Sequence, residues 1–151
     1  MISNLKSSDI EQVDLSRKAF NPVKRKEFTM KLQNGMTLDD LDTFTRAYIE
    51  CALWSSLDDE TLLDQDHDIT SISKECLTAM IADCAKFQTE NMDMIINDLS
   101  QAGHDFWLTR NHHGAGFWDG EYPRNGDVLT AKSHEYGKCD LYIGDDGLIY
   151  C

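Results

Sequence analysis

The residue types best suited to chemistry are concentrated between residues 104 and 120, in the segment HDFWLTRNHHGAGFWDG. Histidine and aspartate bind zinc and related metals, and a His/Asp pair can also transfer protons. One hypothesis is therefore a small enzyme or metal-dependent hydrolase, with a site centred on His104, Asp105, His112 and His113. No serine or cysteine lies in this segment to act as a nucleophile.

The turn that this segment favours argues against a shared metal site. We expect residues 111–114 (Asn-His-His-Gly) to connect two strands, because this register pairs Leu108 with Phe117. Asp119 then lies about four residues from the turn, roughly 13 Å from its histidines at ~3.3 Å per residue. Because that distance exceeds one coordination sphere, we assign no metal, cofactor or catalytic residue.

The tryptophans of the same predicted hairpin suggest an interaction surface. Trp107 and Trp118 would share one face, opposite the apolar face with Leu108 and Phe117. Either an N-terminal arm covers the two tryptophans or they contact a partner, since exposed Trp is common at interfaces. A structural or dimerising module that uses the Trp107/Trp118 face, such as a homodimer, is therefore an alternative hypothesis.

Residues 64–75 partly match the loop with which EF-hand proteins bind calcium. Positions 1, 3, 5 and 12 of that template are Asp64, Asp66, Asp68 and Glu75. Position 6, where glycine makes the sharp turn, is Ile69. We therefore expect Ser73 to cap a following helix rather than calcium to bind in this loop.

Helical periodicity and turn residues indicate the elements that must position these groups. A helix is expected over residues 37–56, capped by Thr37, and a longer one over 74–100, with a bend near 89–91 and an end at Gly103. A short helix over 126–137, capped by Asp127, and a hairpin over 140–150 follow. This order predicts an α+β fold: two N-terminal helices, then a β-hairpin, a short helix and a β-hairpin, forming a small antiparallel sheet covered by helices.

Charge is distributed unevenly along the chain, whose formal net charge is −13. Residues 1–35 are read as a polar, basic N-terminal arm, and residues 36–151 as an acidic α+β domain. Between Arg46 and Lys74 there is no basic residue, whereas seven acids occur there. Such a body repels nucleic acid and attracts basic protein surfaces.

Length and composition narrow the class of protein. A chain of 151 residues fits one domain with its own core. It contains neither an apolar run long enough for a membrane span nor an apolar N-terminal segment like a signal peptide, so we expect a cytoplasmic protein. The five cysteines form no CxxC pair, and we expect them to be reduced.

Three segments carry a resemblance to a known family: AYIECALWSS (47–56), AGHDFWLTRNHHGAGFWDG (102–120) and DLYIGDDGLIY (140–150). The chain resembles a family of small, acidic, functionally uncharacterised proteins of tailed bacteriophages over roughly residues 40–151. The resemblance implies a phage gene product that acts in the cytoplasm of a bacterial host cell. It transfers no functional residues.

Acidity and this resemblance together give the leading functional hypothesis. We expect an accessory protein, not an enzyme, that binds a basic host or phage protein through an acidic surface. By imitating the charge of DNA it would block a nucleic-acid-binding protein of defence or replication. The expected partner-binding residues are Asp58, Asp59, Glu60, Asp64, Asp66, Asp68, Asp83, Glu90, Trp107 and Trp118. No direct contact with nucleic acid or membrane is expected.

Overall fold

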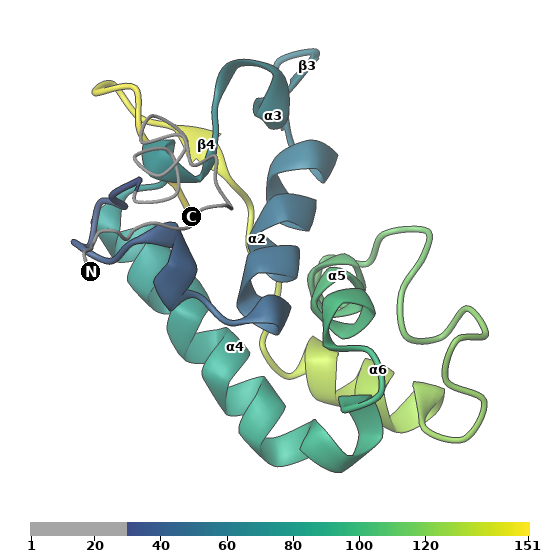
Figure 1. Ribbon diagram of the computed structural model, residues 1–151. Coiled ribbons are helices and arrows are strands. Elements are labelled where there is room, and N and C mark those ends of the chain that lie inside the picture. The colour runs from purple at the N-terminus through teal and green to yellow at the C-terminus, as the bar shows by residue number, and fades with distance from the viewer. Residues whose placement is uncertain (1–29) are drawn as a thin grey trace, which may run out of the picture. The chain divides into compact units, whose positions relative to one another are not determined.

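The structure, a computed structural model, describes residues 30–151, and its compact unit runs from Lys31 to Cys151. Most of the predicted N-terminal arm, residues 1–29, lies outside the described residues, whereas Leu32 is buried in the compact unit. The elements in chain order are η1 (Leu38–Asp40), α2 (Thr43–Ser55), β2 (Leu57–Asp58), β3 (Thr61–Leu62), α3 (Leu63–Asp66), η2 (Ile69–Ser71), α4 (Lys74–Ile95), α5 (Leu99–Arg110), α6 (Gly126–His134), β4 (Tyr142–Ile143) and β5 (Ile149–Tyr150). Figure 1 shows α2 and α5 packed beside the long α4.

Side-chain caps explain where the three main helices begin. Asp42, Ser73 and Asp98 each accept a hydrogen bond from a backbone N–H of the first turn of α2, α4 and α5, respectively. Each bond satisfies a donor that the helix itself leaves unpaired. The predicted role of Ser73 is confirmed, and so is the bend in α4, where Asn91 has non-helical dihedral angles.

The helices enclose a core of stacked aromatic rings. Phe87 of α4 lies 4.2 Å from Phe106 of α5 and 5.7 Å from Phe117, measured between ring centroids. Phe44 and Tyr48 of α2 complete the cluster, at 5.9 and 5.3 Å from Phe106. Because aromatic side chains bury a large apolar area each, these rings supply much of the apolar contact between α2, α4 and α5.

A buried arginine connects the core to the chain after α6. The guanidinium of Arg110 donates to the Tyr48 hydroxyl, the Asp83 carboxylate and the backbone carbonyls of Tyr136 and Gly137, at 2.8–2.9 Å. Such a buried cation is tolerated only when its donors are satisfied, as they are here. Arg110 therefore positions the end of α5 against α2, α4 and the chain that follows α6.

The predicted hairpin at residues 104–120 is wrong. Residues 99–110 form helix α5, and residues 111–125 form a loop without strands. Gly103 does not end a helix but lies inside α5, where a Cβ atom would approach the Phe44 carbonyl oxygen to 2.2 Å. The missing side chain lets α5 lie against α2, and this pairing of elements is the most extensive in the unit.

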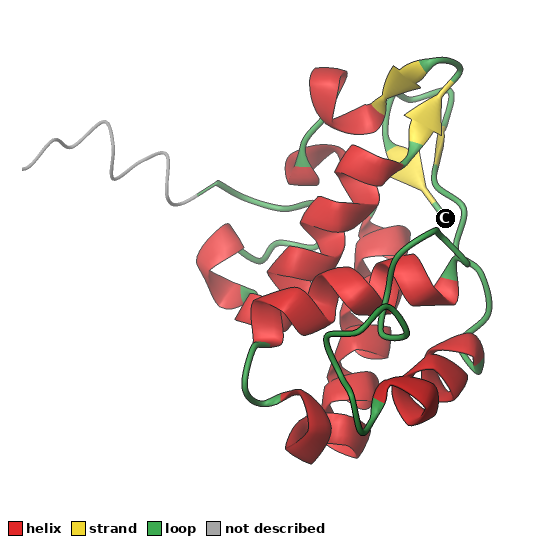
Figure 2. Cartoon of the chain, turned by 90° about the vertical axis from the view of Figure 1, so that its right-hand side faces the viewer, coloured by secondary structure: helices red, strands yellow, loops and turns green. Residues whose placement is uncertain are grey.

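Two small antiparallel hairpins supply the β part of this α+β fold. β4 pairs with β5 around an Asp146-Gly147 turn, which confirms the C-terminal hairpin. β2 pairs with β3 between α2 and α3, where no strand was predicted. The predicted single sheet covered by helices is wrong, because the two hairpins are separate two-stranded sheets, and Figure 2 shows both at one end of the helical body.

A disulfide corrects the prediction that all five cysteines are reduced. Cys76 of α4 is bonded to Cys151 after β5, while Cys51, Cys84 and Cys139 remain thiols. The bond joins the C-terminal hairpin to α4, beside a backbone hydrogen bond from Ser73 to the Ile149 carbonyl. Among residues 30–151, no helix combines the length and apolarity that crossing a bilayer requires.

Candidate functional site

The histidines of residues 104–113 are not assembled into one site. His104 lies within α5 with its ring 6.4 Å from that of Trp54, whereas His112 lies beyond the helix and stacks on His134 at 4.3 Å. From His104 to the end of α5 at Arg110 the helix rises by about 9 Å, and His112 lies two residues beyond that end. Within residues 30–151, no group of three or more His, Cys, Asp or Glu side chains is arranged to hold a metal ion.

Asp105 follows His104 in the sequence, and its side chain is buried in the compact unit. Its side chain is 2% exposed and accepts a hydrogen bond from Gln101, and its second oxygen has no partner among the described residues. Burial raises the pKa of Asp105 to about 6, with Asp119 and Glu121 adding to the shift. The His104 side chain points about 100° away from that of Asp105 around the helix, since adjacent residues on a helix do not face each other. The proposed His/Asp pair is therefore not formed.

The predicted Trp107/Trp118 face is also wrong. Trp107 is 1% exposed, and its indole N–H donates to the Ser55 hydroxyl at 2.9 Å. Trp118, in the loop after α5, is 51% exposed. Because residues 104–110 are helical, the two rings are not cross-strand neighbours, and Trp107 belongs to the core.

The acidic segment between α2 and α4 is built as a hairpin, a helical turn and a second turn. Asp58, Asp59 and Glu60 lie on the β2–β3 hairpin, and Asp64, Asp66 and Asp68 lie on α3 and before η2; all six are exposed. Asp68 caps η2 by accepting from the Thr70 backbone N–H. Asp64 and Asp66 lie in α3 and Asp68 caps η2, so residues 64–68 do not form one continuous loop.

A pocket lies at the base of this acidic segment. It has a volume of about 320 Å³ and is formed by one face of α2 together with η1, α3 and η2: Leu38, Arg46, Ile49, Glu50, Leu53, Trp54, Asp64, His67, Asp68 and Ile69. The α2 residues recur at steps of three and four, so they share one face of that helix. Ile49 and Leu53 are buried, and Trp54 is 44% exposed.

The rim of the pocket is mainly acidic. Glu50, Asp64 and Asp68 are exposed, and Arg46 is the one basic residue among the pocket-lining residues. His67 adds a ring nitrogen, Nδ1, that is enclosed and has no hydrogen-bond partner among residues 30–151. An apolar base with a carboxylate rim can receive a group that is both apolar and positively charged.

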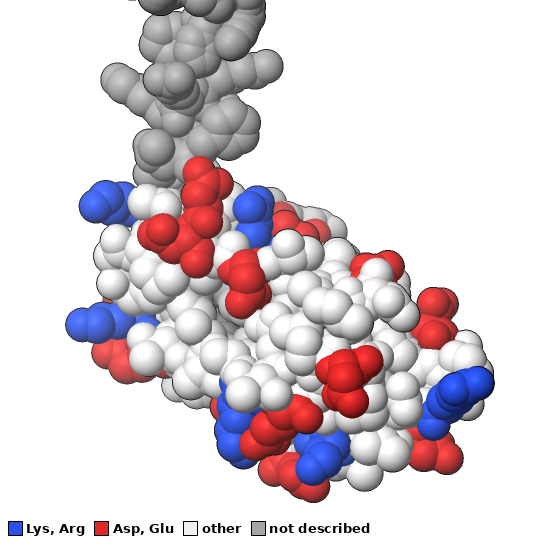
Figure 3. All heavy atoms as spheres, turned by 60° about the horizontal axis from the view of Figure 1, so that its bottom comes forward, with Lys and Arg blue, Asp and Glu red and all other residues white. Residues whose placement is uncertain are grey.

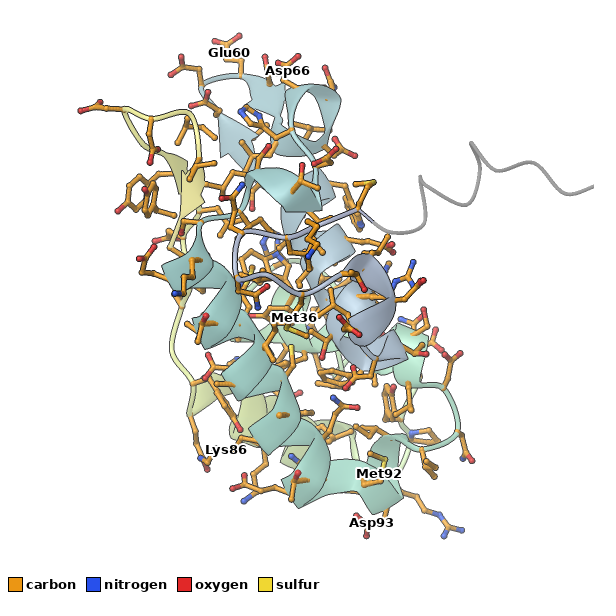
Figure 4. All side chains as sticks on the ribbon, turned by 60° about the vertical axis from the view of Figure 1, so that its left-hand side comes forward. Met36, Glu60, Asp66, Lys86, Met92 and Asp93 are labelled. Atoms are coloured by element: carbon orange, nitrogen blue, oxygen red, sulfur yellow. A yellow bond between two sulfur atoms is a disulfide. The ribbon has the colours of Figure 1, made fainter. Side chains whose placement is uncertain are left out.

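The acidic residues do not form one continuous face along α4. In Figure 4, Glu60 and Asp66 lie at one end of the compact unit and Asp93 at the other. Asp83 pairs with Arg110 at 2.9 Å, and Glu90 pairs with Lys86 at 3.7 Å, so each has a counter-charge. Figure 3 shows the end opposite the hairpins, where acidic and basic side chains are interspersed among uncharged ones. Asp83 and Glu90 thus each lie beside a base, unlike the acids of residues 47–73, a segment with no Lys or Arg.

A sequence signal for the pocket lies in α2, where apolar residues occupy more than one face of the helix. Phe44, Tyr48 and Cys51 lie on the core face, whereas Ile49, Leu53 and Trp54 line the pocket, at helical spacing from Arg46 and Glu50. A helix that is apolar around most of its circumference must be covered on two sides, and the segment YIECALW has such a distribution of apolar residues.

Searches of protein-family models, curated proteins and solved structures found no match to this chain.

Proposed function

We propose that this protein binds a basic protein partner through the acidic end of its compact unit. This end consists of the β2–β3 hairpin and α3, with the exposed acids Asp58, Asp59, Glu60, Asp64, Asp66 and Asp68. The observation that carries the proposal is the apolar pocket with a carboxylate rim, next to the exposed acids of the β2–β3 hairpin. Residues 47–73 contain seven acids and no base. Opposite charge speeds encounter, and an apolar pocket adds contact area that charge alone lacks.

The class of partner follows from the charge and from the family resemblance. We infer a phage accessory protein that acts inside a bacterial cell, with a basic host or phage protein as its target. A nucleic-acid-binding protein is the favoured target class, because its binding surface is already basic and an acidic ligand would compete with phosphates. The surface involved is the acidic end alone, since Asp83 and Glu90 are paired with bases.

Charge reversal at the acidic end tests this function. The variant Asp58→Lys/Glu60→Lys/Asp64→Lys should lose binding, because three of the carboxylates that attract the partner become repulsive. Asp59 stays unchanged, since its φ of 55° suits aspartate better than lysine. The immobilised full chain would be incubated with bacterial lysate at about 50 mM salt, and retained proteins would be compared between variants.

A matched variant separates a local site from general acidity. Asp93→Lys/Glu121→Lys/Glu135→Lys changes the net charge by the same amount at exposed positions outside the acidic end. We expect this control to retain the partner and the first variant to lose it, with wild-type binding abolished at about 500 mM salt. Equal retention by both variants, or equal loss, would contradict a binding site at the acidic end.

A further inference from the structure

The pocket beside Trp54 has a chemistry more specific than attraction of positive charge. Its accessible apolar surface is formed by Leu38 and Ile69, which are partly exposed, and by Trp54, which is 44% exposed, with Ile49 and Leu53 buried beneath them. Glu50 and Asp64 lie on the rim and are exposed. A volume of about 320 Å³ is at the small end of ligand pockets, which suits one long side chain better than a folded element.

We propose that this pocket binds an arginine side chain of the basic partner, an inference that rests on the proposed function. The aliphatic stem of the arginine would lie on Leu38 and Ile69, which are partly exposed, and its guanidinium would stack on the Trp54 ring. From there its N–H groups would reach the rim carboxylates. This arrangement combines stem burial, a cation–π contact and charge-assisted hydrogen bonds in one group.

An apolar side chain would fit the base of the pocket but not its rim. Covering Glu50 and Asp64 with a group that has no donors removes water from two carboxylates and leaves them unpaired. The loss of solvation of an unpaired buried charge outweighs the gain from burying one apolar side chain, which is about 1.5–3 kcal/mol. The rim therefore selects for a positively charged group.

Lysine would match the negative charge of the rim but would stack less favourably on the Trp54 ring. Its ammonium is compact and strongly hydrated, whereas the planar guanidinium is weakly hydrated and stacks on aromatic faces. Arg46 also lines the pocket, with one positive charge against the three carboxylates of Glu50, Asp64 and Asp68. The lining therefore keeps a net negative charge that a cation of the partner would offset. The pocket accordingly favours arginine over lysine.

Three short peptides test the inference with the full-length protein. They have the form acetyl-Gly-Gly-Xaa-Gly-Gly-amide, where Xaa is arginine, lysine or norleucine, and their binding is followed by NMR through the indole N–H of Trp54. We expect the arginine peptide to bind most tightly, at least about fivefold tighter than the lysine peptide, with the norleucine peptide weakest. The exposed Trp118 provides an internal reference signal that should not move.

Two variants and one control complete the test. Trp54→Leu keeps an apolar wall but removes the π-face, so affinity for the arginine peptide should fall by about tenfold. Glu50→Gln/Asp64→Asn should also weaken arginine binding, while Trp118→Leu should leave it unchanged. Equal affinity for arginine and lysine, or tightest binding of norleucine, would overturn the arginine pocket but leave the acidic-end proposal standing. That proposal fails separately, if charge reversal does not change capture.

Discussion

At the residue scale, Asp105 makes the stability of the protein depend on pH. Burial raises its pKa from 3.8 to about 6, so between these values the folded chain holds a proton that the unfolded chain releases. Stability must therefore fall as pH rises through this window, and the cost of the buried charge is complete above it. Asp105→Asn should raise the free energy of unfolding by about 1–3 kcal/mol at pH 7.5 and by much less at pH 4.

Urea unfolding of both proteins at pH 4.0, 5.0 and 7.5 measures this dependence. Asp93→Asn, at an exposed position on α4, is the matched control and should change stability by less than about 0.5 kcal/mol at each pH. If Asp105→Asn changed stability by the same amount at all three pH values, the pKa of Asp105 would not be raised in the fold.

The exposure of the acidic residues at the acidic end could be predicted from the sequence, but the pocket beside them could not. Exposure of Asp58, Glu60 and Asp64 follows from charge alone, because carboxylates are almost never fully buried unless they are paired. The pocket forms only where α3 and η2 fold back onto α2, and that contact is tertiary. Trp107 shows the converse difficulty: its burial depends on Ser55, fifty-two positions earlier, which accepts its N–H.

At the element scale, Gly103 decides how closely α5 approaches α2. A Cβ at this position would lie 2.2 Å from the Phe44 carbonyl oxygen and 3.0 Å from the Ala47 Cβ, so the helices would have to separate. Helix propensity favours alanine over glycine by about 1 kcal/mol, whereas overpacking costs about 1–3 kcal/mol and disturbs the largest helix pairing. Gly103→Ala should therefore lower the melting temperature, which thermal unfolding by circular dichroism measures.

Gly114 is the control for that substitution. It lies in the loop after α5 with open space around the position of a Cβ, so Gly114→Ala should leave the melting temperature nearly unchanged. A rise in melting temperature for Gly103→Ala would mean that propensity outweighs the close approach, and that the α2–α5 distance is not set by this glycine.

The same glycine explains why α5 was predicted as a strand. Gly103 followed by the aromatic and β-branched residues of HDFWLT is typical of a helix end and a strand start. The Asp98 cap and the later Phe106 and Arg110 fit a helix equally well. Local patterns could not choose between them, because the choice depends on the surface of α2 that α5 covers. By contrast, the β4–β5 hairpin was predictable, since its Asp-Gly turn is a local signal.

At the scale of the whole molecule, the charge is less uniform than the composition suggests. A net charge of −13 indicates repulsion within an acidic body. In the fold, part of this charge is balanced, as with Asp83 and Arg110, while the β2–β3 hairpin and α3 carry carboxylates with no base in their own segment. The exposed acids of residues 58–68 thus lie at and beside the pocket, where the proposed partner would bind.

The Cys76–Cys151 disulfide encloses most of the compact unit, including α5, α6 and the C-terminal hairpin, in a covalent loop with a sequence separation of 75. Restricting an unfolded loop of this length stabilises the fold by about 4 kcal/mol in the chain-entropy account.

The variant Cys151→Ser should therefore be less stable than the wild type by about this amount in oxidising buffer, and the two proteins should be nearly equal in stability with a thiol reductant. Cys139→Ser, which removes a free thiol, should keep the wild-type response to reductant. Urea unfolding with and without dithiothreitol measures all three proteins. Under the proposed function the protein acts in a bacterial cytoplasm, which keeps thiols reduced, so the reduced form would meet the partner. A wild-type protein whose stability does not change with reductant would contradict a contribution of this bond to the fold.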